Sequence, residues 1–192
     1  TFVTGNCGLS AIGFDDDTPY KDKIGGGLFF FNGTTGKYGS IKEFNAAIDR
    51  NMPCNIATLV GHCSARASVS GYESRKISAE EEKMLGILED NLRDGAAGVS
   101  LGLMYEPGLY ADTEELKKVV KLCCKYNKPL TVHPRAESKV SMSYDSLFGR
   151  SHLLRAEDEL VEISKGTNLK LQHSHAIFVG RQSFGDKDEF VA

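Results

Sequence analysis

Five short runs of apolar residues alternate along this chain with longer segments of helical periodicity, and this alternation limits the fold more than any other feature. The apolar runs span residues 1–4, 55–60, 98–103, 130–133 and 169–173. Short runs that are continuously apolar are typical of parallel strands covered on both faces. The chain is therefore predicted to form βαβ units around a parallel sheet, which is an α/β fold.

The segments between the runs carry signals of helix ends. Helices are predicted at residues 40–50, 78–94, 113–126 and 156–164, with a further helix beginning near residue 186. Ser40 and Glu43 have the spacing of a capping box. Ser78 and Thr113 are the predicted N-caps of the next two helices.

Two architectures are compatible with this alternation: a doubly wound sheet and a part of a (β/α)₈ barrel. A complete barrel takes about 250 residues, so the 192 residues of this chain would hold about five of its eight units. The strand spacing is too irregular for a solenoid repeat. Two long polar or Gly-rich segments, 15–39 and 136–150, follow strand ends. Such loops often carry function in α/β folds.

Composition and charge exclude several classes of partner. The chain has 23 Lys and Arg against 26 Asp and Glu, a net charge of −3, and no basic cluster, so no nucleic-acid partner is expected. No apolar stretch approaches the roughly 20 residues of a membrane span, so no membrane partner is expected either. Five cysteines without disulfide spacing favour a cytoplasmic setting. The sequence predicts no particular oligomeric state.

Cysteine and histidine residues fall at the carboxyl ends of the predicted strands. Cys7 follows the first run, His133 ends the fourth, and His173 and His175 lie at the end of the fifth. Side chains at the carboxyl ends of parallel strands converge on one opening. A thiolate and two imidazoles would suit Zn²⁺. Either His173 or His175 could be the second imidazole, and packing or hydrogen-bonding roles are the alternatives.

The other candidate residues have weaker signals. His62 follows the second run and could line a pocket or pack in the core, whereas His152 is expected in an exposed loop. The four cysteines besides Cys7 are interpreted as small apolar fillers or idle thiols: Cys54, Cys63, Cys123 and Cys124. There is no P-loop, dinucleotide-binding or nucleophile-elbow motif. The alternative to an enzyme is a non-catalytic α/β binding module.

Several stretches of the chain, in order, resemble the N-acyl-D-amino-acid deacylase (D-aminoacylase) family of the metal-dependent amidohydrolase superfamily. These stretches read VTGNCGLS, NIATLVGH, GAAGVSLGLMYEPGLYADTEEL, TVHPRAES and LQHSHAIFVG. The resemblance spans nearly the whole chain and implies about five β/α units of a TIM-like (β/α)₈ barrel. It implies that Cys7, His133 and His175 bind Zn²⁺, with the Ser-His motif selecting His175 over His173.

The resemblance also implies an activity for the parent protein. It would be a zinc-dependent amidohydrolase that acts on C–N bonds other than peptide bonds and removes the acyl group from a small-molecule N-acyl-D-amino acid. Tyr105 and Arg135 are the candidates to stabilise the oxyanion or to bind the substrate carboxylate, and His62 is a further candidate for substrate binding. A structural hydroxyl and a loop-ordering salt bridge are the alternative roles of Tyr105 and Arg135. A cyclic amidase of the hydantoinase or dihydroorotase type and a non-catalytic metal-binding module are the alternative functions.

The chain departs from the family pattern in three respects. A first-strand His-x-His pair and a late Asp that acts as general base are not found in residues 1–192, so this segment is expected to be a partial barrel domain truncated at both ends. A Lys of the family motif is replaced where the chain reads Ser174-His175-Ala176-Ile177, which puts the substrate preference in doubt. Loop carboxylates such as Glu137 are not fixed over the metal by any sequence signal. The isolated chain is therefore expected to have little deacylase activity.

Overall fold

The computed structural model describes residues 1–15, 17–20, 38–146 and 148–192, and these residues form the predicted α/β fold. Five strands make one sheet in the order β1-β2-β3-β4-β5, and all neighbouring strands are parallel. The strands are β1 (Phe2–Thr4), β2 (Ile56–Gly61), β3 (Gly98–Gly102), β4 (Pro129–His133) and β5 (Lys170–His173). A strand order that never reverses is that of a barrel segment, whereas a doubly wound sheet reverses direction.

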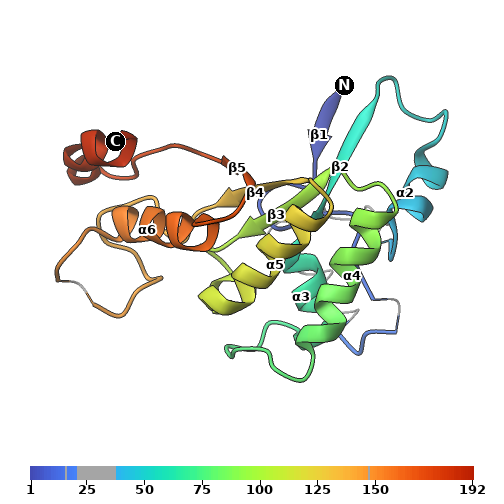
Figure 1. The fold of residues 1–192 in the computed structure, drawn as a ribbon, viewed down its shortest axis with the longest axis horizontal. Helices are drawn as coiled ribbons and strands as arrows, with labels where there is room; N and C mark the ends of the chain where they lie inside the picture. The colour runs from blue at the N-terminus through green and yellow to red at the C-terminus, as the bar shows by residue number, and fades with distance from the viewer. Residues whose placement is uncertain (16, 21–37, 147) are drawn as a thin grey trace.

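Helices connect the strands and gather beside the sheet. They are α2 (Ile41–Ile48), α3 (His62–Ser70), α4 (Glu81–Arg93), α5 (Thr113–Lys125), α6 (His152–Ser164) and α7 (Lys187–Val191), with 3₁₀ turns η1 (Gly108–Tyr110) and η2 (Arg181–Asp186). Figure 1 shows α3, α4 and α5 on one side of the sheet, with α4 and α5 in contact. None of the helices in the described residues is long and apolar enough to cross a membrane.

The hydrophobic core lies between the central strands and helices α4 and α5. Side chains of β2, β3 and β4 are at most 2% exposed: Leu59, Val60, Val99, Leu101, Leu130 and Val132. The helices add side chains at helical spacing that are fully buried: Met84, Leu88, Leu116 and Val119. The outer strand β1 differs, since Phe2 and Val3 are about half exposed. A continuous apolar run is therefore a clearer sign of a buried central strand than of an edge strand such as β1.

The N-cap of α2 is the one that the sequence predicts. The Ser40 hydroxyl accepts a hydrogen bond from the Glu43 amide (3.2 Å), and the Glu43 carboxylate accepts one from the Ser40 amide (3.1 Å). We expect Ser40→Ala to lower the free energy of unfolding by about 1 kcal/mol, because a helix amide loses its partner. Urea denaturation measures the change. Ser78→Ala is the control, since Ser78 caps no helix through its side chain; equal losses in both variants would contradict this role of Ser40.

Three predicted helix ends are wrong. Helix α4 begins at Glu81 rather than at residue 78, and α6 begins at His152 rather than at residue 156. The N-cap of α5 is Asp112 instead of Thr113, because the Asp112 carboxylate accepts a hydrogen bond from the Glu115 amide at 2.9 Å. Helix α3 was not predicted at all. It begins directly after β2 and is buried along almost its whole length.

His152 is buried, which corrects the expectation of an exposed loop residue. It is 2% exposed at the start of α6. Its Nδ1 accepts a hydrogen bond from the Ser141 amide (2.8 Å), so the proton is on Nε2, which donates to the Ser146 carbonyl (2.6 Å). His152 thus ties the 136–150 segment to α6. In the other long segment, 15–39, residues 16 and 21–37 lie outside the described residues.

Candidate metal centre

Cys7 lies in the turn that follows β1, and its backbone is in the left-handed region (φ 59°). A non-glycine residue there costs free energy and persists only where its surroundings enforce it. The Ser100 hydroxyl of β3 accepts a hydrogen bond from the Gly8 amide and donates one to the Gly5 carbonyl. The Tyr105 hydroxyl donates to the carbonyl of Cys7 itself. Side chains from β3 and from the loop after it therefore fix the turn that carries the thiol.

The two histidines come from the carboxyl ends of neighbouring strands. His133 is the last residue of β4, and His175 follows β5 by two residues. The Ser174 amide donates to the Val132 carbonyl (2.8 Å), which extends the pairing of these strands beyond β5. His175 then adopts a left-handed backbone (φ 59°), like Cys7. Two of the three candidate ligands are thus in conformations that are concentrated at functional sites.

The structure brings Cys7, His133 and His175 together. Each of them offers one ligand atom, and these three atoms lie within 4.8 Å of one another. The Cys7 Sγ is 3.0 Å from the His175 Nε2, and the rings of His133 and His175 have centroids 4.8 Å apart. His173, the alternative ligand, instead contacts the Glu157 carboxylate through Nε2 (2.8 Å). The geometry therefore favours His175 over His173.

The electrostatics of the trio suit a cation. Burial, together with the neighbouring charges of His175 and His173, lowers the pKa of His133 to about 4, so its ring is neutral at pH 7. Both ring nitrogens of His133 are buried and have no hydrogen-bond partner among the described residues. A buried polar atom without a partner is costly, and a metal ion would satisfy one of these nitrogens. One thiol and two imidazoles are also a donor set that Zn²⁺ accepts. The residues present therefore fit a zinc ion.

The Cys7 thiol is protonated in the absence of a metal. Burial raises its pKa, the Tyr105 hydroxyl beside it lowers the pKa, and the negative charge of Glu137 raises it; the net effect is an increase. Because the thiolate is the form that ligates metals, binding of a cation by Cys7 would release a proton.

Tyr105 lies beside the trio. Besides its hydrogen bond to the Cys7 carbonyl, its ring meets that of His133 edge-to-face at a centroid distance of 5.2 Å. Burial is the main cause of the raised pKa of its hydroxyl, so it stays a phenol. These contacts correspond to the structural role that the sequence left open, and they place the hydroxyl close to the metal ligands.

Most of the hydrogen-bond donors of the Arg135 guanidinium contact other groups of the protein. Its Nε and Nη2 contact the Glu159 carboxylate at 2.9 and 3.0 Å, and Nη1 and Nη2 donate to the Leu109 and Ala111 carbonyls. Arg135 as a whole residue is 7% exposed. The loop-ordering salt bridge is therefore the role that the contacts of Arg135 support.

His62 is part of a buried ionic cluster rather than an exposed surface. It is fully buried in α3, and its Nε2 lies 2.7 Å from the Glu115 carboxylate, which also accepts a hydrogen bond from Arg66 Nε at 3.0 Å. Of the two roles left open for His62, packing is the one that these contacts support.

Glu137 is the residue near the trio whose position the sequence did not indicate. It is 5% exposed, and its Oε1 lies 3.6 Å from the His133 Nε2. The only signal in the sequence is its place four residues after His133, which by itself does not distinguish it from other loop carboxylates.

Comparison with known proteins shows which sequences this chain resembles. No protein-family model matches the chain. Two proteins of Alcaligenes xylosoxydans xylosoxydans align with 98% of it, a D-aminoacylase at 27% identity and an N-acyl-D-aspartate deacylase at 28%. An N-acyl-D-glutamate deacylase of the same organism is 30% identical over 70% of the chain. The chain spans 27–36% of the length of these relatives.

Solved structures of deacylases match the fold of this chain. A D-aminoacylase crystal structure, described as defining a novel subset of amidohydrolases, matches 97% of the chain with a TM-score of 0.77 and 26% identity. An N-acyl-D-glutamate deacylase from Bordetella bronchiseptica, complexed with zinc and a phosphonate inhibitor, matches 98% with the same score and identity. The chain covers 36% and 37% of these structures. The fold is thus a segment of the D-aminoacylase fold.

Proposed function

Because the chain is homologous, along nearly all of its length, to the N-acyl-D-amino-acid deacylases of the amidohydrolase superfamily, we propose that it is the metal-binding part of a zinc-dependent deacylase. The substrate class would be N-acyl-D-amino acids, because two of the relatives are named N-acyl-D-glutamate deacylase and N-acyl-D-aspartate deacylase and the third is named D-aminoacylase. The observation that carries the proposal is the convergence of Cys7, His133 and His175. These are soft and borderline donors at the carboxyl end of a parallel sheet, where such folds place their active sites.

The residues of the chain would have separate tasks in this reaction. Cys7, His133 and His175 would hold the ion, and Tyr105 and Ser100 would keep the Cys7 turn in its left-handed conformation. A bound zinc ion supplies Lewis-acid polarisation of a carbonyl and lowers the pKa of water. Arg135 would order the loop that contains Leu109 and Ala111, through the two carbonyl contacts it makes there.

We also propose that residues 1–192 are part of a larger barrel domain. The outer edges of β1 and β5 have no strand partner within the described residues. Unpaired strand edges tend to associate with other chains, and closed barrels remove them. Further strands next to β1 and β5 would close the sheet and exclude water from the candidate site.

Metal analysis and a substrate panel test the proposal together. We expect the purified chain to retain zinc through gel filtration, and the protein that contains it to hydrolyse N-acetyl-D-amino acids in preference to their L enantiomers. Product amine is measured with a colorimetric reagent, before and after removal of the metal by a chelator. Turnover of a hydantoin alone would indicate a cyclic amidase instead. A protein without bound metal and without turnover would contradict the proposal.

A further inference from the structure

Glu137 is held in place by the segment that follows His175. Its backbone carbonyl accepts a hydrogen bond from the Val179 amide (2.7 Å), and the next residue, Ser138, forms a parallel β-bridge with Val179. The Lys139 amide donates to the Ser183 hydroxyl at 2.9 Å. The loop after β4 and the chain after β5 are thus joined beside the trio, and the Glu137 side chain is buried at this junction.

Three buried polar atoms at this junction have no hydrogen-bond partner among the described residues. They are the Oε1 of Glu137 and both ring nitrogens of His133. The Oε1 and the His133 Nε2 lie 3.6 Å apart, which is longer than a hydrogen bond but needs only a small shift to become one. Catalytic hydrogen bonds are often long in unliganded sites and tighten when the site is filled. A small shift would therefore let the Glu137 carboxylate accept a hydrogen bond from the His133 imidazole.

We propose that Glu137 is a positioning residue: it accepts a hydrogen bond from His133 Nε2 and leaves Nδ1 of the same ring for the metal. This inference rests on the metal site proposed above. A ligating histidine commonly donates its second ring nitrogen to a carboxylate, which fixes the tautomer and the orientation of the ring. The group of mutually close ligand atoms comprises Cys7, His133 and His175. Glu137 thus contacts His133 from outside this group.

The charge balance supports the same assignment. A Zn²⁺ ion with one thiolate and two neutral imidazoles has a net charge of +1, and a buried net charge is costly. A carboxylate in contact with one of the imidazoles would offset this charge without occupying a coordination position. The chain contains a similar pair outside the trio, since the Glu157 carboxylate contacts His173 Nε2 at 2.8 Å. Glu157 is therefore a matched control.

The test compares the affinities of Glu137 and Glu157 variants for Zn²⁺, measured by competition with a chromogenic chelator. We expect Glu137→Leu to lower the affinity by about 10- to 100-fold. Glu137→Gln keeps an acceptor but loses the charge, so its affinity should lie between those of Glu137→Leu and the unmodified chain. Glu157→Leu should leave the affinity nearly unchanged. If Glu137→Leu fails to fold by circular dichroism, the Gln variant carries the test, and an unchanged affinity in it overturns the inference.

Two further outcomes separate this inference from its premise. An unmodified chain that binds no zinc contradicts the proposed metal site, whereas an unmodified chain that binds zinc as tightly as the Glu137 variants do contradicts only the role of Glu137. The visible absorption of the Co²⁺-substituted chain reports the coordination number. We expect the same band intensity in the unmodified chain and in Glu137→Gln. A changed intensity would make Glu137 a ligand and overturn its assignment as a positioning residue.

Discussion

Replacement of Cys7 by serine is expected to lower the affinity of the chain for Zn²⁺ by more than about 100-fold. Removal of a group that only hydrogen-bonds to a metal ligand already lowers the affinity by about 10- to 100-fold, and Cys7 would be a ligand itself. The thiolate contributes a negative charge as well as a lone pair, and its loss leaves two neutral imidazoles. Serine has nearly the same size. The contacts that hold the turn go to backbone atoms of residues 5–8, so they survive the substitution. Equilibrium dialysis against Zn²⁺ measures the change.

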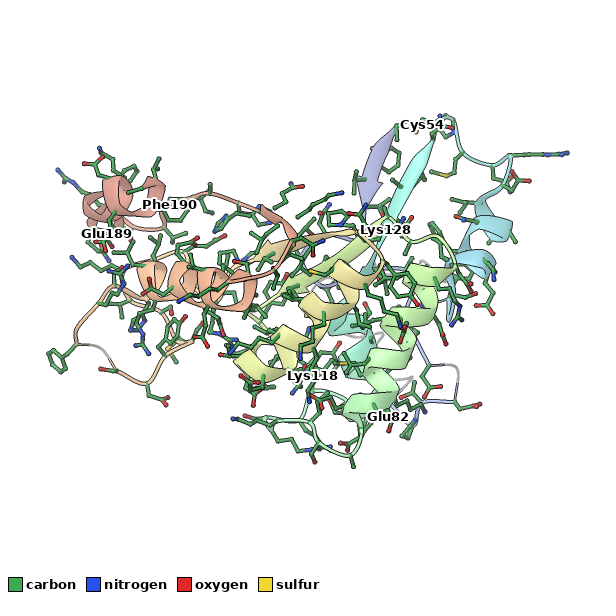
Figure 2. All side chains as sticks on the ribbon, viewed as in Figure 1. Cys54, Glu82, Lys118, Lys128, Glu189 and Phe190 are labelled. Carbon is green, nitrogen blue, oxygen red and sulfur yellow. The ribbon has the colours of Figure 1, made fainter. Side chains whose placement is uncertain are left out.

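The other cysteines provide controls for this experiment. Cys54 lies just before β2, at the amino end of the strand and exposed to solvent (Figure 2). Cys124 is a partly buried residue of α5. We expect Cys54→Ser and Cys124→Ser to bind zinc like the unmodified chain. Equal zinc content in all three variants would show that Cys7 is only a packed thiol.

Substitution of Glu115 by alanine should lower the free energy of unfolding by about 3–5 kcal/mol. Glu115 is 3% exposed and joins α5 to α3 through His62 and Arg66, and the side chain of Arg66 is fully buried. Without the carboxylate, a buried guanidinium loses its counter-charge. Burial alone would raise the pKa of Glu115, but the contacts with His62 and Arg66 outweigh it and hold the pKa below its usual value.

Chemical denaturation at neutral pH measures this loss, with Glu114→Ala as the control. Glu114 is the neighbouring, exposed residue and pairs with Lys117 at the surface, where an ion pair contributes about 0–1 kcal/mol. Because the pKa of Glu115 is lowered on folding, its contribution is present above the unfolded pKa of about 4.3 and is lost as the pH falls through the folded value. Equal effects of both variants would contradict a structural role for the buried cluster.

The positions of the strands and of four of the longer helices were predictable, to within a few residues, because they depend on local pattern. The run 98–103 contains β3, whose residues are all buried. Strands buried on both faces of a parallel sheet are apolar at successive positions, so their sequence reveals them. The capping box of Ser40 and Glu43 is likewise a contact between residues three apart. The rule that parallel strands end at one opening predicted that Cys7 and His133 converge with either His173 or His175. The choice of His175 came from the resemblance to the deacylase family.

Helix α3 and the position of His152 were not predictable, because both depend on contacts between distant segments. Helix α3 reads HCSARASVS and has no apolar stripe, no side-chain cap and little contrast between its faces. It is helical because tertiary contacts bury it on nearly all sides, including the ion pair of Arg66 with Glu115. His152 is buried by the loop around Ser141. The loop of Glu137 is joined to the chain after β5 by the Ser138–Val179 bridge, a contact between distant segments that no local pattern indicates.

The curvature of the sheet, which brings the ends of the two outer strands together, would make metal affinity depend on the rest of the molecule. In a flat sheet, β1 and β5 would lie about 19 Å apart, at four spacings of about 4.8 Å. Cys7 Sγ and His175 Nε2 follow these strands, yet they are 3.0 Å apart across 168 positions of sequence. An ion between them would act as a cross-link that favours the curved sheet over a flattened or frayed one. Part of the binding free energy would then maintain this curvature, so a core substitution that touches none of the ligands would still weaken zinc binding.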